Sequence, residues 1–249
     1  MHYVVCILLF PLMFIQARLV KKNTPKLPEA AGKRCGKLGQ GPAVSLLVLG
    51  DSAAAGVGVD EQKQALSGTV SAGLAKYFSV SWQLLAKSGS NTQQTLQMLN
   101  KKHAQQPLHF DVVLVSLGVN DVLSPISAGQ WVKQQRDLIA FLNTEVNCRQ
   151  LILTPVPPMG QFPALPQPLR WVLGQRCNEF NRHLSQLVES QLCTLLEFDT
   201  NSMQAESIDL AAEPEAEVMA ADGFHPGADT YKLWGLNVVE TIIKHRAMA

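Results

Sequence analysis

Short apolar runs recur along the chain, each bounded by glycine, proline or polar residues. The clearest is Val44–Leu49, which is apolar except for Ser45 and stops at Gly50. A run of this length and composition favours a strand buried on both faces of a parallel sheet. Four further runs predict strands in the same way: Val80–Leu85, Val112–Leu117, Leu151–Leu153 and Leu192–Phe198.

Apolar residues between these runs recur at helical spacing. One set is Leu66, Val70, Leu74 and Phe78, and a second is Leu173, Cys177, Phe180, Leu184 and Leu187. A last helix is expected from about Asp229 to Ile243, with a buried side made of Tyr231, Trp234, Val238, Val239 and Ile242. Strands that alternate with helices predict βαβ units. The expected fold is therefore an α/β, three-layer α/β/α (flavodoxin-like) domain with a mostly parallel five-stranded sheet.

The first 20 residues differ from the rest of the chain. Residues 3–20 are apolar except for Gln16 and Arg18, and Pro11 lies in the middle. Because a membrane-spanning helix needs about 20 largely apolar residues, this segment is marginal as a span. We favour an uncleaved membrane anchor, and a cleaved signal peptide and a helix packed on the domain stay open. A signal peptide would show a basic start and a small-x-small cleavage site, and here only His2 precedes the apolar run.

A basic segment follows. Residues 18–37 contain seven Lys or Arg residues against the single Glu29. If the first segment spans a membrane, this excess places the domain in the cytoplasm, and export is the alternative. Residues 21–43 are rich in Lys, Gly and Pro without periodicity, which is typical of a linker. The division is then an N-terminal segment over 1–20, a linker over 21–43 and one domain over 44–249.

Bulk composition narrows the possible partners. The 21 basic and 20 acidic residues nearly cancel, so nothing points to a nucleic-acid partner. The five cysteines are odd in number and widely spaced, and no His stands near them at zinc-ligand spacing, so no metal site is expected. Scattered thiols fit a reducing compartment better than a disulfide framework.

Four short polar motifs stand where strands or loops are expected to end. They are Gly50-Asp51-Ser52, Ser88-Gly89-Ser90-Asn91-Thr92, Gly118-Val119-Asn120-Asp121 and Asp222-Gly223-Phe224-His225. In open parallel sheets the ligand binds beyond the carboxyl ends of the strands. We therefore expect all four motifs to face one crevice.

Three of these residues fit nucleophilic catalysis. A serine hydroxyl needs a base to remove its proton, and that base works best when a third group fixes its tautomer. Ser52, His225 and Asp222 match those roles, because three residues of separation let one loop bring the Asp222 carboxylate to Nδ1 of His225. Taken alone, Ser52 is more often a helix cap, and Asp222 is more often part of a turn before a helix. Their joint placement favours a catalytic triad.

Acyl transfer also needs donors for a developing oxyanion. The candidates are the backbone N–H groups of Ser52 and Gly89 and the side-chain amide of Asn120. Gly89 has an alternative explanation as a turn glycine with positive φ, and Asn120 as part of a strand-ending turn.

With these motifs in order, the chain resembles the SGNH, or GDSL-type, hydrolase family of esterases and lipases over about residues 44–245. The resemblance implies that Ser52 is the nucleophile, that Gly89 and Asn120 donate to the oxyanion, and that Asp222 and His225 complete the triad. It implies a serine esterase that works by a ping-pong acyl-enzyme route with no cofactor or metal. The chain departs from the namesake motif at Ala53, where leucine is usual.

The segment after the fourth predicted strand bears on the substrate. Six prolines lie between residues 155 and 168, and Met159, Phe162 and Leu165 stand among them. These residues either form an apolar wall for an acyl chain or belong to a covering loop with core contacts. The expected substrate is a small-molecule or lipid-like ester or thioester, for example a lysophospholipid. A carbohydrate O-acetyl ester and a catalytically silent binding module are the alternatives.

Overall fold

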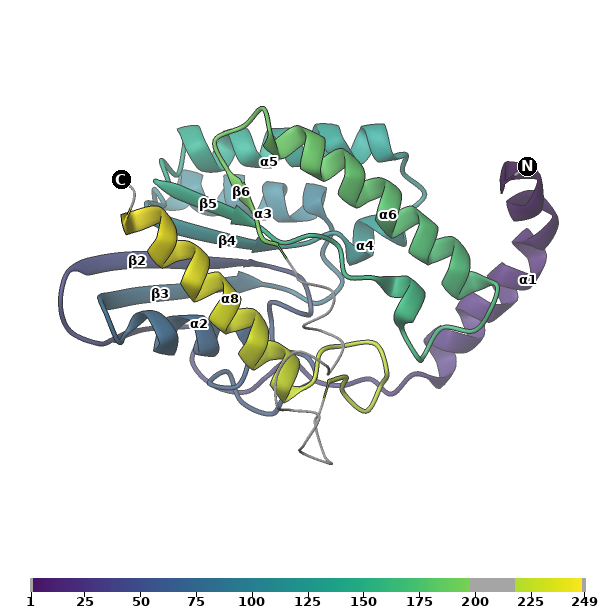
Figure 1. Ribbon diagram of the computed structural model, residues 1–249, viewed down its shortest axis with the longest axis horizontal. Coiled ribbons are helices and arrows are strands. Elements are labelled where there is room, and N and C mark those ends of the chain that lie inside the picture. Colours follow the sequence, from purple (N-terminus) through teal and green to yellow (C-terminus); the bar gives the residue numbers. More distant parts are fainter. Residues whose placement is uncertain (1, 198–217, 248–249) are drawn as a thin grey trace.

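The structure, a computed structural model, describes residues 2–197 and 218–247. Its centre is a six-stranded sheet in the order β1-β3-β2-β4-β5-β6 (Figure 1). The strands from β3 to β6 pair in parallel, and β1 joins the β3 edge antiparallel. The strand bounds are β1 Cys35–Leu38, β2 Ala43–Gly50, β3 Ser79–Ala86, β4 Val112–Ser116, β5 Gln150–Leu153 and β6 Thr194–Leu195.

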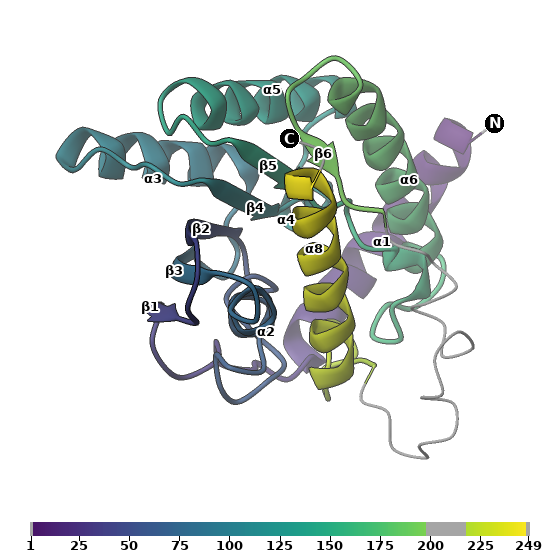
Figure 2. The ribbon, with the colours of Figure 1, turned by 60° about the vertical axis from the view of Figure 1, so that its left-hand side comes forward.

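Helices cover both faces of the sheet. Figure 2 shows α2 and α8 together on one side, with α3, α5 and α6 on the other. The bounds are α1 His2–Asn23, α2 Leu66–Leu74, α3 Thr92–Gln105, α4 Val119–Val122, α5 Ala128–Thr144, the short 3₁₀ helix η1 Met159–Gln161, α6 Leu169–Val188 and α8 Ala228–Ala247. The expected three-layer α/β/α arrangement is confirmed.

Two hydrophobic cores explain why β2 is apolar from Leu46 to Leu49. Leu47 and Leu49 point to the core under α3, α5 and α6. Leu46 and Val48 point to the opposite core under α2 and α8. Because side chains alternate along a strand, a strand covered on both faces needs apolar residues at every position. The predicted buried faces of α2, α6 and α8 are confirmed, except that Phe78 lies beyond the end of α2.

The prediction of five strands was wrong by one edge strand. The five predicted strands correspond to β2–β6, of which β6 is shorter than expected, and Phe198 lies outside the described residues. The sixth strand, β1, lies within residues 21–43, which were interpreted as a linker. All four residues of β1 are exposed, so no buried alternation marks them. The strand is defined by its pairing with β3, from Cys35 opposite Gln83 to Leu38 opposite Val80.

The N-terminal helix α1 packs against α6. Met13 is only 9% exposed and joins the core. The side chain of Gln16 donates to the carbonyl oxygen of Gln167 at 2.7 Å and accepts from the N–H of Leu169 at 3.2 Å. Figure 1 shows α1 beside the first turns of α6. Among the described helices, none combines the length and the hydropathy that crossing a membrane requires.

Core packing around the central strands predicts a strong effect of cavity formation. Leu114 on β4 is fully buried, whereas Leu192 is 86% exposed. The Leu114→Ala variant should lower the free energy of unfolding by about 2–5 kcal/mol, because it leaves a cavity between two packed layers. The matched Leu192→Ala variant should change it by less than about 0.5 kcal/mol. Urea unfolding followed by circular dichroism measures both, and similar losses in the two variants would contradict the described core.

Candidate active site

The nucleophile turn begins where β2 meets its neighbour β4. A Cβ atom on Gly50 would lie 2.2 Å from the carbonyl oxygen of Ser116 and 2.6 Å from Cβ of Ala54, so glycine alone fits this position. The next N–H, of Asp51, donates to that same Ser116 oxygen at 3.2 Å. The chain then turns tightly, with the N–H of Ala55 donating to the carbonyl oxygen of Asp51 at 2.9 Å. Ser52 is thereby held at the carboxyl edge of the sheet.

A tyrosine from α8 supports this turn from the other side. Tyr231 is fully buried, and its hydroxyl is shared between the carbonyl oxygens of Ala53, at 2.9 Å, and Val57, at 2.8 Å. Burial raises the pKa of Tyr231, so the hydroxyl keeps its proton and stays a donor. The helix α8 therefore fixes the backbone that follows Ser52 at two points.

Ser52, His225 and Asp222 form one hydrogen-bonded chain. Nε2 of His225 lies 2.9 Å from Oγ of Ser52, and Nδ1 lies 2.6 Å from Oδ2 of Asp222. With Nδ1 protonated toward the carboxylate, Nε2 is free to accept the serine proton. The other carboxylate oxygen, Oδ1, accepts the N–H groups of Phe224 and His225, both at 2.9 Å. Asp222 thus orients the imidazole and shapes the loop that carries it.

The charge of Asp222 suits this role. Its side chain is only 1% exposed, against 19% for His225. Burial alone would raise the pKa of Asp222, but the backbone and ring of His225 and the N–H of Phe224 outweigh it and hold that pKa below its ordinary value. The carboxylate is therefore ionised at neutral pH, where it stabilises a positive imidazolium.

The three candidate oxyanion donors differ in their hydrogen bonding. Within the described residues, the backbone N–H groups of Ser52 and Gly89 donate to no protein acceptor. Gly89 has φ +80°, and no atom lies within 4 Å of the position that a Cβ would take. The amide Nδ2 of Asn120 donates to Oδ2 of Asp51 at 3.1 Å and to the carbonyl oxygen of Ser90 at 3.0 Å. Asn120 thus links the neighbours of Ser52 and Gly89.

Two further aspartates, Asp51 and Asp121, hydrogen-bond the loops that carry the motifs. Asp51 is 3% exposed and accepts the N–H of Ala53 at 3.1 Å in addition to the Asn120 amide. Burial, aided by the nearby charge of Asp121, raises the pKa of Asp51 to about 7. Asp121 is fully buried and accepts the N–H and, at 2.9 Å, the hydroxyl of Thr92. Burial also raises the pKa of Asp121. These carboxylates hold the motifs together and do not reach the imidazole.

A cavity of about 440 Å³ opens beside Ser52 and His225. Its lining is mainly apolar and comes from residues 155–158 and 161–163, from the loop around Phe224 and from Trp234 on α8. Phe162 lines this cavity and meets the ring of Phe224 edge-on, with the ring centroids 5.1 Å apart.

Of the three pocket residues predicted from the sequence, the structure places only Phe162 in this lining. Met159 and Leu165 are 0% and 2% exposed and belong to the core. The turn of η1 directs Met159 inward, which the spacing of prolines does not reveal. Sequence reasoning also missed Phe224 and Trp234 as lining residues. Phe224 could have been found, since it stands between Asp222 and His225 and must lie near the nucleophile.

A serine, a histidine and an aspartate in hydrogen-bonded order, at the carboxyl edge of a parallel α/β sheet, define a serine hydrolase. Residues 48–233 match the model of the GDSL-like lipase/acylhydrolase family. This range is most of the chain, so the protein belongs to that family and acts on ester bonds. The resemblance seen in the four motifs is confirmed.

Solved structures share the fold. TesA superposes with a TM-score of 0.61 at 20% identity, covering 80% of this chain and 97% of its own. The psychrotrophic esterase EstA from Pseudoalteromonas sp., inhibited by monoethylphosphonate, gives 0.58 at 20% identity, covering 82% and 98%. Axe2, an acetylxylan esterase from Geobacillus stearothermophilus, gives 0.55 at 16% identity, covering 83% and 94%. No curated protein matches the sequence.

The raised pKa of Asp51 predicts a pH-dependent stability. Between its ordinary value of 3.8 and about 7, the unfolded chain releases this proton and the folded chain keeps it. The wild type should therefore lose roughly 1.4 kcal/mol of unfolding free energy per pH unit from this group as pH rises from about 4 to about 7, with no further loss above. Asp51→Asn removes this contribution, because the amide does not titrate.

Urea unfolding at intervals from pH 4 to pH 8 measures the effect as the difference between the wild type and Asp51→Asn. That difference should change steadily up to about pH 7 and then level off. Ser52→Ala is the control, since it alters the same turn and leaves Asp51 in place, so it should keep the wild-type slope. A constant difference between Asp51→Asn and the wild type across the whole range would refute the raised pKa.

Proposed function

We propose that the protein hydrolyses lipid-like acyl esters or thioesters through an acyl-enzyme on Ser52. The observation that carries this proposal is the apolar cavity that opens directly at the Ser52–His225 pair. A substrate carbonyl beside Oγ of Ser52 would have its acyl chain against Phe162 and its neighbours. The family fixes ester hydrolysis, and the cavity favours an acyl group longer than acetyl.

The first half of the reaction forms the acyl-enzyme. Oγ of Ser52 attacks the carbonyl carbon while Nε2 of His225 takes its proton, and Asp222 stabilises the resulting imidazolium. The tetrahedral intermediate collapses, and His225 returns the proton to the departing alcohol or thiol. Water then attacks the acyl-enzyme with His225 again as the base, which releases the acid and restores Ser52.

The oxyanion would be held by three donors. The N–H groups of Ser52 and Gly89 are available within the described residues, and both are backbone groups in tight turns. Asn120 would keep its bond to the Asp51 carboxylate and turn its second amide hydrogen from the Ser90 carbonyl toward the oxyanion. The two backbone donors need not move, and such fixed donors act most strongly on charge that develops only in the transition state.

The size and lining of the cavity bear on the acyl group. Small-molecule sites typically measure about 300–1,000 Å³ and are mostly apolar, with a few polar groups that fix orientation. An acetyl group would leave most of the 440 Å³ unfilled, whereas a chain of about eight carbons or a lysophospholipid acyl chain would bury its methylenes there. A carbohydrate O-acetyl ester is the second candidate, because an acetylxylan esterase shares the fold.

Removal of the nucleophile tests the mechanism. Ser52→Ala should fold like the wild type and lose turnover of p-nitrophenyl octanoate by at least about 10³-fold, because no acyl-enzyme can form. Initial rates, circular dichroism and melting temperature measure this outcome. A fluorophosphonate probe should label the wild type and leave Ser52→Ala unlabelled. Undiminished turnover in the variant would exclude the mechanism, and an unlabelled, inactive wild type would indicate a silent binding module.

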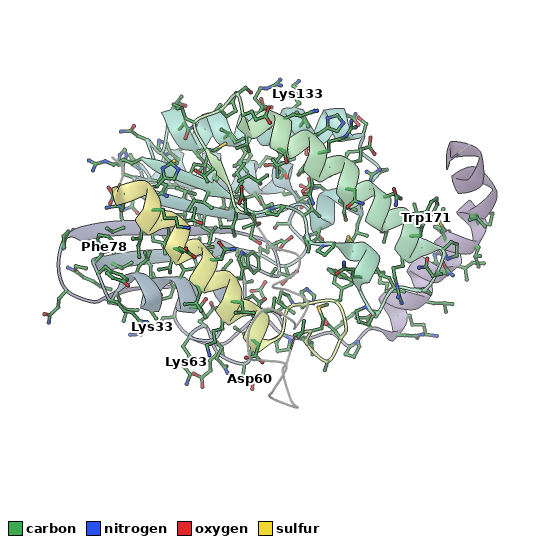
Figure 3. All side chains as sticks on the ribbon, viewed as in Figure 1. Lys33, Asp60, Lys63, Phe78, Lys133 and Trp171 are labelled. Carbon is green, nitrogen blue, oxygen red and sulfur yellow. The ribbon has the colours of Figure 1, made fainter. Side chains whose placement is uncertain are left out.

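The acyl-chain proposal predicts a selective loss on long substrates. Phe162→Ala should lower kcat/KM for p-nitrophenyl octanoate by about 10- to 100-fold, since apolar contact with the chain is lost, and change the acetate ester much less. The control is Phe78→Ala. Phe78 directly precedes β3 and lies at the amino ends of the parallel strands, whereas the cavity opens at their carboxyl ends (Figure 3). A panel of esters from acetyl to palmitoyl, with acetylated sugars and a lysophospholipid, gives the comparison. Equal losses on all chain lengths would reject the acyl wall.

A further inference from the structure

The segment ahead of the catalytic motifs is bound to the domain over residues 24–34, here called the N-terminal strap. Ala31 pairs with the loop after the nucleophile turn, since its N–H donates to the carbonyl oxygen of Asp60 and its carbonyl accepts the N–H of Gln62, both at 2.8 Å. The Gln62 side chain donates to the carbonyl oxygens of Ala30 and Ala55, at 3.1 and 2.8 Å. The middle of the strap is therefore fixed next to the turn that carries Ser52.

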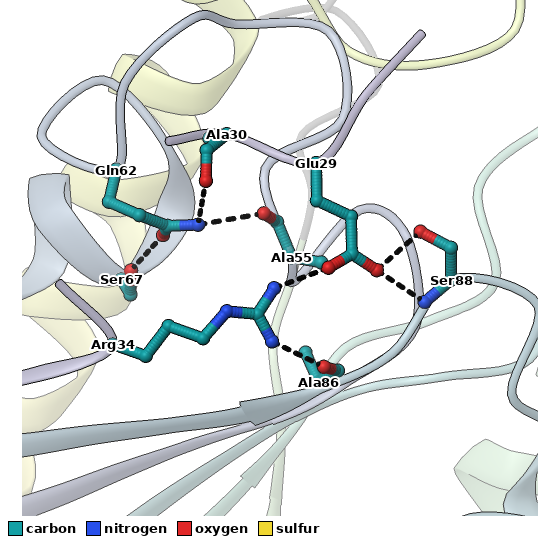
Figure 4. Close-up of polar contacts among 8 residues, drawn as sticks. All are labelled: Glu29, Ala30, Arg34, Ala55, Gln62, Ser67, Ala86 and Ser88. Carbon is teal, nitrogen blue, oxygen red and sulfur yellow. Dashed lines mark hydrogen bonds and ion pairs between the residues drawn. The ribbon is translucent and has the colours of Figure 1, made fainter. Parts of the chain in front are cut away.

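Two charged residues of the strap, Glu29 and Arg34, bind the end of β3 and the residues that follow it. Glu29 forms an ion pair with Arg34, and Arg34 donates to the carbonyl oxygen of Ala86 at 2.8 Å. Oε1 of Glu29 accepts both the N–H of Ser88, at 2.8 Å, and its hydroxyl, at 2.7 Å. Figure 4 shows the Glu29 carboxylate between the Arg34 guanidinium and Ser88. The pair thus holds the backbone of the loop from Ala86 to Ser88.

Gly89 follows immediately and lacks packing of its own. No atom lies within 4 Å of its missing Cβ position. Its place is set by its neighbours, with Ser88 bound to Glu29 on one side and Ser90 bound to Asn120 on the other. A short internal bond, from the N–H of Ser90 to the carbonyl oxygen of Lys87 at 3.1 Å, makes the turn compact. The position of the Gly89 N–H therefore depends on Ser88, the adjacent residue that Glu29 holds by both its N–H and its hydroxyl.

The chemistry of Glu29 suits a fixed support. Burial raises its pKa, but the two bonds from Ser88 and the charge of Arg34 outweigh this and hold the pKa below its ordinary value. The carboxylate is therefore charged when it accepts the Ser88 N–H, which makes that hydrogen bond stronger than a neutral one. The Glu29 side chain is 32% exposed, and an ion pair so exposed adds little to overall stability.

We propose that the Glu29–Arg34 pair positions the Gly89 N–H for the oxyanion, so that the strap ahead of the family domain sets the rate of the chemical step. Both residues precede residue 48, where the match to the family model begins. The inference rests on the proposed function, in which Gly89 is an oxyanion donor. Glu29 and Arg34 act through Ser88 and touch no substrate.

The test compares Glu29→Ala, Glu29→Gln and Ser88→Ala on p-nitrophenyl octanoate. Glu29→Ala should lower kcat by about 10- to 100-fold with KM within about twofold, because a misplaced donor weakens binding of the transition state more than of the substrate. Glu29→Gln keeps an acceptor for Ser88 and should recover part of this loss. Ser88→Ala keeps the N–H that Glu29 accepts and should lose less than Glu29→Ala.

The matched control is Glu240→Ala on α8, which breaks an exposed ion pair with Lys244 of 2.8 Å and should leave kcat unchanged. Melting temperatures are recorded for every variant. A kcat of Glu29→Ala within twofold of the wild type overturns the inference, and so does a loss that follows a lowered melting temperature and recovers on cooling. The proposed function is judged separately, by the dependence of wild-type turnover on Ser52 and by the ester panel.

Discussion

The close approach of β2 and β4 at their carboxyl ends is the constraint on which the site depends. Gly50 and Ser116 stand opposite each other in the parallel register, and a side chain on Gly50 would strike the Ser116 carbonyl. The turns that follow the two strands must therefore leave the sheet side by side. One turn carries Ser52 and the other carries Asn120, so the nucleophile and a candidate oxyanion donor are neighbours before any side chain of the site forms a bond.

The three aspartates near the site differ in pKa and in role because their surroundings differ. Asp222 accepts backbone N–H groups, which keep its pKa low and its charge available to His225. Asp51 and Asp121 are buried with fewer compensating donors, so burial raises the pKa of each. A buried carboxylate that binds Asn120 or Thr92 joins two loops that are far apart in the sequence. The same residue type thus orients the base in one place and supports loops in two others.

The sequence predicted the parts of the structure whose physical cause is local. Strands β2, β4 and β5 were recognisable because burial on both faces requires apolar runs. The spacing of Asp222 and His225 likewise has a mechanical reason. The exposed strand β1 has no such pattern and depends on pairing with β3. Met159 and Leu165 resemble Phe162 in the sequence, and only the η1 turn decides which of them faces the cavity. The contact of Glu29 with Ser88 joins two irregular segments, so no periodicity marks it.

In the proposed mechanism Gly89 is an oxyanion donor, which must be both rigid and accessible, and its neighbours supply the rigidity. Packing against a side chain at this position would fix the peptide but would also fill the space in which the oxyanion develops. Glycine keeps that space open and tolerates the φ of +80° that the turn adopts at this position. The rigidity then has to come from the flanking residues, where Glu29 holds Ser88 and the N–H of Ser90 donates to the carbonyl oxygen of Lys87. Because preorganised donors are most effective when they need not move during the reaction, the proposal makes these flanking contacts as necessary for the chemical step as the orientation of the triad.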